Sequence, residues 1–162
     1  MGTKQELGLA VNGGGEALVS RPQVTQAITR GARRMLSAMG QSSLVEVTLK
    51  GGRRADILAF DKTGRITIVE VKSGQPDFAA DGKWREYLEF CDRFYFAVDQ
   101  DFPQTLIPDD CGLMVADSYE AAIIREASEV PLAPARRRAM MLTVARVGAD
   151  RLHLLQDPGL AL

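Results

Sequence analysis

Two apolar runs joined by a short turn signal constrain the fold of this chain more than any other feature. Residues 54–60 and 65–72 are typical of β-strands, and the sequence Asp-Lys-Thr-Gly at 61–64 suits a type I turn that ends with Gly64 in the left-handed conformation. Both alternating faces of each run are apolar apart from a few charged positions. The two runs are therefore predicted to form a β-hairpin within a sheet that is covered on both sides.

The turn also predicts the register of the hairpin. A three-residue loop pairs the residues that flank it, and counting back along both strands places Asp56 opposite Glu70 and Arg54 opposite Lys72. Side chains alternate between the faces of a strand, so Asp56, Glu70 and Lys72 are expected on the same face. Cβ atoms of directly opposed residues lie about 4.5–5.5 Å apart. The sequence thus predicts that two carboxylates and an amine meet in one cluster.

Such a cluster is costly in a covered sheet unless a cation is present. Opposed like charges destabilise a strand pair, and burial raises the pKa of at least one carboxyl group. A divalent metal with oxygen ligands, Mg²⁺ or Mn²⁺, resolves the conflict. Asp56 and Glu70 are the expected ligands, with the backbone carbonyl of Val71 as a third oxygen. The alternative is a buried ion-pair cluster without chemistry, in which Lys72 or Arg54 offsets the charge.

If a metal binds, the predicted chemistry is hydrolysis of a phosphodiester, with Asp56, Glu70 and Lys72 as the catalytic residues. The metal would activate water and stabilise charge on the phosphate. Lys72 would hold or deprotonate the attacking water, or offset the charge of the phosphate.

The rest of the chain predicts one α/β domain over residues 20–155. Its 162 residues suffice for one core, and a glycine-rich segment at 1–19 and the last residues, 156–162, are expected to be tails. A helix is predicted between Ser20 and Gly40, and further segments follow in the order α-β-β-β-α-β and then β, β, α. These segments are strands 44–49, 54–60 and 65–72, helix 76–91, strands 94–98, 113–116 and 121–125, and a basic helix from Pro134 towards Leu155.

Composition excludes several classes of function. With His153 as the one histidine, nucleophilic triads and histidine-rich metal sites are excluded unless that residue serves. Cys91 and Cys111 fit reduced thiols in a cytosolic protein, and Cys91 is expected to be buried packing. No apolar run approaches the roughly 20 residues of a membrane span. The net charge of −1 leaves only local basic patches for binding a polyanion.

Two basic patches have open interpretations. Arg30, Arg33 and Arg34 fall on the polar face of the first predicted helix, where they are either solvated or contact DNA phosphates. The run 136–138, three arginines at the start of the last helix, either is solvated or grips the DNA backbone together with Arg54.

Ala55-Asp56 followed by Glu70-Val71-Lys72 resembles the motif of the PD-(D/E)xK phosphodiesterase superfamily, which includes type II restriction endonucleases and archaeal Holliday-junction resolvases. The resemblance extends over about residues 20–150. It is closest to the MmcB-like DNA repair family of alphaproteobacteria, in the blocks 52–56, 69–73, 81–87, 90–98 and 132–137. It implies a restriction-endonuclease-like α-β-β-β-α-β core whose mixed sheet is covered by helices on both faces. It also implies a DNA repair function in the bacterial cytoplasm, associated with the nucleoid.

The superfamily further implies a Mg²⁺-dependent DNA endonuclease, with Mn²⁺ as the alternative metal and DNA as the partner. Other repair proteins are further candidate partners, and many nucleases of this fold act as homodimers. Superfamily members often place a polar residue on the second helix to contact phosphate or water, which points to Lys83 beside Trp84. A core aromatic is the stronger interpretation of Trp84, and Lys83 is otherwise exposed.

The chain departs from the superfamily pattern in two places. Ala55 replaces the proline before the aspartate, and the first helix contains no acidic residue. Gln23 or Gln26 would have to stand in for that acid, or Glu46 from the first strand would supply a carboxylate. The departure keeps a second hypothesis open, a DNA-binding or repair-scaffold module that retains the nuclease fold without cleaving.

Overall fold

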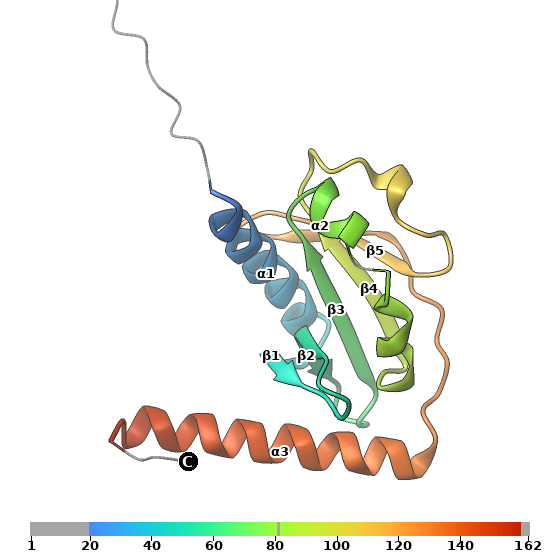
Figure 1. Ribbon diagram of the computed structural model, residues 1–162. Coiled ribbons are helices and arrows are strands. Elements are labelled where there is room, and N and C mark those ends of the chain that lie inside the picture. The colour runs from blue at the N-terminus through green and yellow to red at the C-terminus, as the bar shows by residue number, and fades with distance from the viewer. Residues whose placement is uncertain (1–19, 81, 160–162) are drawn as a thin grey trace, which may run out of the picture.

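A six-stranded mixed sheet forms the centre of the computed structural model, which describes residues 20–80 and 82–159 (Figure 1). Neighbouring strands follow chain order, antiparallel from β1 to β3, parallel from β3 to β5, and antiparallel again at β6. The strands are β1 (Ser42–Thr48), β2 (Arg54–Phe60), β3 (Ile66–Lys72), β4 (Arg93–Val98), β5 (Gly112–Ala116) and β6 (Ala121–Arg125).

In the described residues, three α-helices and two 3₁₀ helices surround the sheet. They are α1 (Arg21–Ala38), α2 (Gln75–Ala80), α3 (Pro134–Gln156), η1 (Trp84–Glu89) and η2 (Gln104–Leu106). The predicted α/β class and the order of the first elements are confirmed. The tail predicted over 1–19 lies outside the described residues, as do positions 160–162 of the predicted C-terminal tail. Within the part of the chain that the structure describes, no helix is long and apolar enough to cross a membrane.

The β2–β3 hairpin has the predicted turn and, from Phe60–Ile66 to Ile57–Val69, the predicted register. The Gly64 N–H donates to the Asp61 carbonyl at 3.0 Å, and Gly64 adopts a φ of 79°. The Asp61 N–H then donates to the Arg65 carbonyl at 3.1 Å, and Ile57 pairs with Val69 further along. All seven residues of β3 are buried, which confirms that this part of the sheet is covered on both faces.

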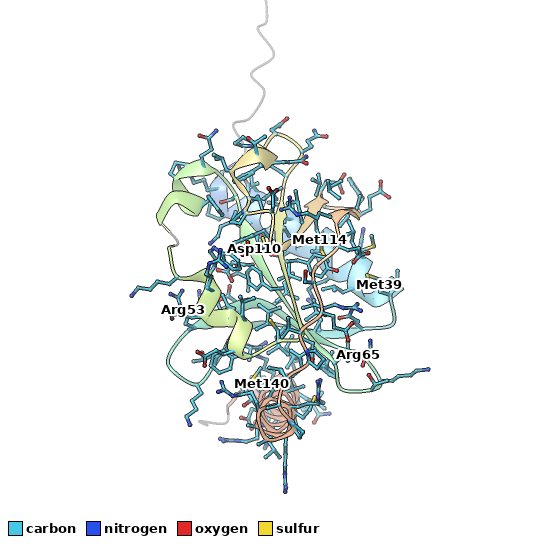
Figure 2. The ribbon with its side chains drawn as sticks, turned by 90° about the vertical axis from the view of Figure 1, so that its right-hand side faces the viewer. Met39, Arg53, Arg65, Asp110, Met114 and Met140 are labelled. Carbon is cyan, nitrogen blue, oxygen red and sulfur yellow. The ribbon has the colours of Figure 1, made fainter. Side chains whose placement is uncertain are left out.

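The helices divide between the two faces of the sheet. The apolar side of α1, with Ile28, Ala32 and Leu36, packs on the face that carries Ile57 and Val69. The opposite face is covered by η1, by the loop before β5 and by α3, through residues that include Trp84, Tyr87, Phe102, Met140 and Val144. Figure 2 views α3 along its axis and shows Met140 where that helix meets the rest of the molecule.

The helix predicted over residues 76–91 is wrong. The structure has instead the short helix α2 and, after it, the 3₁₀ helix η1. The buried aromatic residues Trp84, Tyr87 and Phe90 recur every third position, and a 3₁₀ helix aligns residues i and i+3 on one side. Leu88 lies between two of these positions and is 44% exposed.

Candidate functional site

β2 separates from β3 at Asp56, and this divergence forms the centre of the site. The ladder ends at the Ile57–Val69 pair, so the predicted direct opposition of Asp56 to Glu70, and of Arg54 to Lys72, is wrong. If the ladder continued, the Val71 N–H would donate to the carbonyl of Ala55. It donates instead to the Asp56 carboxylate, Oδ2, at 2.8 Å. The side chain of Asp56 therefore replaces the next backbone bond between the two strands.

The same geometry directs the carbonyl of Val71 towards Asp56. In an antiparallel ladder, a residue presents its N–H and its C=O to the same neighbouring strand. Since the Val71 N–H faces Asp56, the Val71 carbonyl lies on that side too. The two oxygen sources predicted from the sequence thus share the opening between β2 and β3.

Glu70 and Lys72 form a buried pair at the end of β3. Their side chains lie on the same face, 7% and 4% exposed as residues, and Lys72 Nζ is 3.5 Å from Glu70 Oε1. β3 pairs on its other side with β4, where Glu70 lies beside Phe96. A carboxylate and an ammonium so deeply buried stabilise each other, since either alone would pay a large desolvation cost.

Tyr87 lies within the electrostatic influence of both Asp56 and Glu70. It was not predicted to be part of the site. Its hydroxyl donates to the carbonyl of Arg54 at 3.0 Å. Burial, and after it the charges of Glu70 and Asp56, raise the pKa of Tyr87 above its usual value. Both carboxylates therefore act on one phenol. The sequence signal that could have found Tyr87 is its spacing of three residues from Trp84 and from Phe90.

A local irregularity in β1 faces Asp56. Glu46 has a φ of 52°, the one positive value at a non-glycine residue in the described part of the chain, and the Glu46–Asp56 pair is missing between regular pairs on either side. Val45 packs with the α1 side of the sheet, whereas Val47 packs with the opposite core. The strand therefore rotates at Glu46, and strained backbone of this kind clusters at functional sites.

Asp56 also lines a groove between α1 and β1, here called the α1 groove. It has a volume of about 800 Å³, and its lining includes two residues predicted as additional site residues, Gln26 and Glu46. Arg30 and Arg33 lie along its α1 wall. Neither Glu70 nor Lys72 lines this groove. The structure thus places Gln26 and Glu46 with Asp56 in one groove, whereas Glu70 and Lys72 flank Val71, whose N–H Asp56 accepts.

The remaining predicted site residues lie elsewhere. Gln23 accepts a hydrogen bond from the Ser20 N–H at 2.8 Å and so caps the start of α1. Trp84 is a core aromatic that stacks on Phe94, while Lys83 is exposed. Arg54 forms an ion pair with Glu46 at 2.5 Å, so its partner is on β1 and not on β3.

The arginines at 136–138 lie at the far end of β3 from Lys72. α3 crosses below the strands in Figure 1, whereas α2 follows the upper end of β3. Arg137 donates to the carbonyl of Gly64, in the turn before β3, and to both oxygens of the buried carboxylate of Asp92. Arg136 contacts Glu89. Arg138 is exposed, and DNA binding by this run stays a prediction without a link to the Asp56 site.

The described residues contain no group of three or more His, Cys, Asp or Glu side chains that could hold a metal ion. The donors that Asp56, Glu70 and the Val71 carbonyl offer are two carboxylates and one backbone oxygen. Cys91 and Cys111 are both free and buried, and burial raises the pKa of the Cys91 thiol to about 12. Cys91 is therefore packing, as expected, and not an activated nucleophile.

The fold and site define an α/β protein whose mixed sheet presents carboxylates and a lysine where two central strands part. The chain belongs to the family of DNA repair proteins described as MmcB-like, which it matches over residues 16–159, so the predicted family is confirmed. A solved structure of a protein of unknown function from Silicibacter pomeroyi is similar, with a TM-score of 0.81 and 44% sequence identity. That match covers 86% of this chain and 97% of the other. No curated protein matches.

Proposed function

We propose that this protein is a metal-dependent DNA phosphodiesterase that acts in repair and has a restriction-endonuclease-like core. The observation that supports the proposal best is the parting of β2 and β3, where the carboxylate of Asp56 receives the Val71 N–H. In a regular ladder the Val71 N–H would pair with a backbone carbonyl, so the carboxylate at this position is a departure that places Asp56 beside the Val71 backbone. The MmcB-like family name supports a role in DNA repair.

The donor set suits a hard divalent cation. Asp56, Glu70 and the carbonyl of Val71 supply oxygen ligands only, which Mg²⁺ and Mn²⁺ prefer over nitrogen or sulfur. When bound, such an ion supplies a Lewis acid that activates water and stabilises charge on a phosphate. Glu70 contributes a carboxylate to the site, and the ammonium of Lys72 beside it balances the negative charge of that carboxylate.

Lys72 is the residue of this chain that handles the proton. Its side chain is buried beside Glu70, and burial favours the neutral amine whereas the carboxylate favours the charged form. Lys72 therefore holds the attacking water or takes its proton, or offsets charge on the phosphate. Asp56 keeps one oxygen on the Val71 N–H, which fixes the direction of its other oxygen.

Cleavage assays test the proposal. Branched, flapped and damaged DNA would be incubated with the protein and Mg²⁺ or Mn²⁺, beside Asp56→Asn, Glu70→Gln and the matched control Glu89→Gln. Glu89 is an exposed carboxylate whose ion-pair partner is Arg136, on α3. Each site variant should lower the rate by at least about 100-fold, since disturbing even the support of a metal ligand costs 10- to 100-fold. Wild-type cleavage by either variant would refute the site.

A second function, a DNA-binding module without cleavage, is favoured by one observation. α1 contains no acidic residue, so the α1 groove contributes glutamine and arginine side chains where another carboxylate would complete a metal site. In that case wild-type protein binds DNA but cleaves none of the substrates. Calorimetric titration of Mg²⁺ and Mn²⁺, with and without an oligonucleotide, distinguishes the two functions: only the phosphodiesterase loses metal binding in Asp56→Asn.

A further inference from the structure

The exposed surface of α1 carries arginines and no acidic side chain. Four arginines, at positions 21, 30, 33 and 34, and no acidic residues occur between Arg21 and Ala38, although the whole chain has a net charge of −1. The apolar side of α1 is buried against the sheet. All four arginines are exposed, so their charge is turned towards solvent.

The α1 groove continues past the N-terminal half of this helix. A second hollow, of about 560 Å³, is lined by Arg21, Ser73 and Pro76, and both hollows share Thr25 and Gln26 in their lining. The combined track therefore runs from the residue that follows Lys72 on β3, along α1, to Asp56. Hydroxyl and amide groups lie between the arginines, and they hydrogen-bond phosphate oxygens as readily as they bind water.

Two arginines of α1 hydrogen-bond to neighbouring elements and so fix the helix against them. Arg33 Nε donates to the hydroxyl of Ser43 at 3.0 Å, which joins α1 to β1. Arg34 donates to the carbonyl of Tyr119 at 3.0 Å, in the turn between β5 and β6. A guanidinium has five N–H donors, so each arginine keeps donors for another acceptor.

We propose that the α1 track is the surface that binds the DNA backbone and delivers a phosphodiester to Asp56. At 1.5 Å per residue, Arg21 and Arg33 are about 18 Å apart along the helix, which corresponds to about five base pairs of duplex. One small anion cannot reach both ends, whereas a row of phosphates does. The proposal rests on the proposed function for the role of Asp56, and it assigns DNA contact to α1 and not to the arginines at 136–138.

Salt-dependent binding tests this assignment. Fluorescence anisotropy with a labelled DNA duplex would compare Arg21→Gln/Arg30→Gln with Arg138→Gln, an exposed arginine on α3 that serves as the matched control. All proteins would carry Asp56→Asn, so that cleavage does not interfere. Each lost phosphate contact lowers the slope of log K against log salt by about 0.9, which is about fivefold in affinity near 0.15 M salt. The double variant should therefore bind about 30-fold more weakly, and the control should match its parent.

Three outcomes would overturn the proposal: unchanged affinity and slope in the double variant, a loss confined to Arg138→Gln, or tighter binding of an RNA duplex than of DNA. Equal melting temperatures of the variants exclude unfolding as the cause of a loss. Binding that depends on α1 in a protein whose wild type cleaves nothing would retain this proposal and refute the phosphodiesterase. In proteins that retain Asp56, a cleavage rate unchanged by Arg21→Gln/Arg30→Gln but lost in Asp56→Asn would do the reverse.

Discussion

Gly31 provides a sharp test of how α1 is positioned. A Cβ atom added there would lie 2.2 Å from the carbonyl oxygen of Asp117 and 2.3 Å from that of Glu120, both in the turn between β5 and β6. These are backbone atoms, and the turn is braced, because the carboxylate of Asp117 accepts hydrogen bonds from the N–H groups of Tyr119 and Glu120. Gly31→Ala must therefore displace the helix or the turn.

Two opposing contributions determine how much Gly31→Ala changes the free energy of unfolding. Overpacking of this kind costs about 1–3 kcal/mol, and contact with two backbone oxygens favours the upper end. Replacing glycine by alanine inside a helix returns about 1 kcal/mol through helix propensity. The net loss in the free energy of unfolding is about 2 kcal/mol, or about 4–8 °C in melting temperature for a domain of this size.

Gly148→Ala is the matched control for Gly31→Ala. It lies within α3, and a Cβ added there meets nothing within 4 Å. Only the propensity term applies, so Gly148→Ala should stabilise the protein by about 0.5–1 kcal/mol. Thermal and urea unfolding followed by circular dichroism would measure both variants. A Gly31→Ala protein as stable as Gly148→Ala would refute the packing of α1 on the β5–β6 turn.

Two further predictions concern stability. Burial opposes ionisation of Asp92, but hydrogen bonds from Arg137 and from the N–H groups of Ile66 and Leu132 lower its pKa below 3.8. The stability that the ionised Asp92 contributes is therefore present above pH 3.8 and is lost as the pH falls through the folded pKa. Asp92→Asn should cost about 3–5 kcal/mol at pH 7 and flatten the acid limb of the stability curve; an unchanged limb would contradict this. Gly64 has a φ of 79°, so Gly64→Ala should cost about 1–2 kcal/mol, whereas the exposed Gly82→Ala should be near neutral in the same urea titration.

The hairpin was predictable because its signals are local. The turn sequence at 61–64 sets the loop, the loop sets the register, and the register assigns every side chain of β2 and β3 to a face. From Ile57 onward the predicted faces agree with the two cores, with Leu58 and Ile68 on one and Ile57 and Val69 on the other. Ala55 packs in the same core as Leu58, so the alternation of β2 breaks at Asp56.

The end of that ladder was not predictable from the same signals. β2 leaves β3 at Asp56, the residue opposite the irregular position Glu46 of β1, and nothing in the sequence around Glu46 indicates a positive φ. The error in the second helix has a different origin. An apolar stripe at spacings of three and four residues fits a helix of 3.6 residues per turn as well as a 3₁₀ helix, and only the packing of Trp84 on Phe94 selects between them.

The location of the basic surfaces also depends on tertiary structure. Both arginine groups look alike in the sequence, yet the fold directs one to the Asp56 groove and uses the other largely for structure. Arg137 forms an ion pair with the buried Asp92, so the charge of Arg137 is neutralised within the protein. Arg30, by contrast, lines the groove that contains Asp56.

The lack of an acidic residue on α1, which departs from the superfamily motif, and the proposed DNA track have the same electrostatic explanation. A phosphate that approaches Asp56 and Glu70 is repelled by both carboxylates, and a further acid on α1 would add to that repulsion. This chain places glutamine and arginine there, so the helix attracts the phosphate while Lys72 compensates Glu70. Under the proposed function, the absence of the acid would lower the capacity for a second metal ion and would strengthen the binding of the DNA backbone. By this argument, restoring a carboxylate with Gln26→Glu should weaken DNA binding without metal and strengthen metal binding at Asp56, two opposite changes that one calorimetric series would resolve.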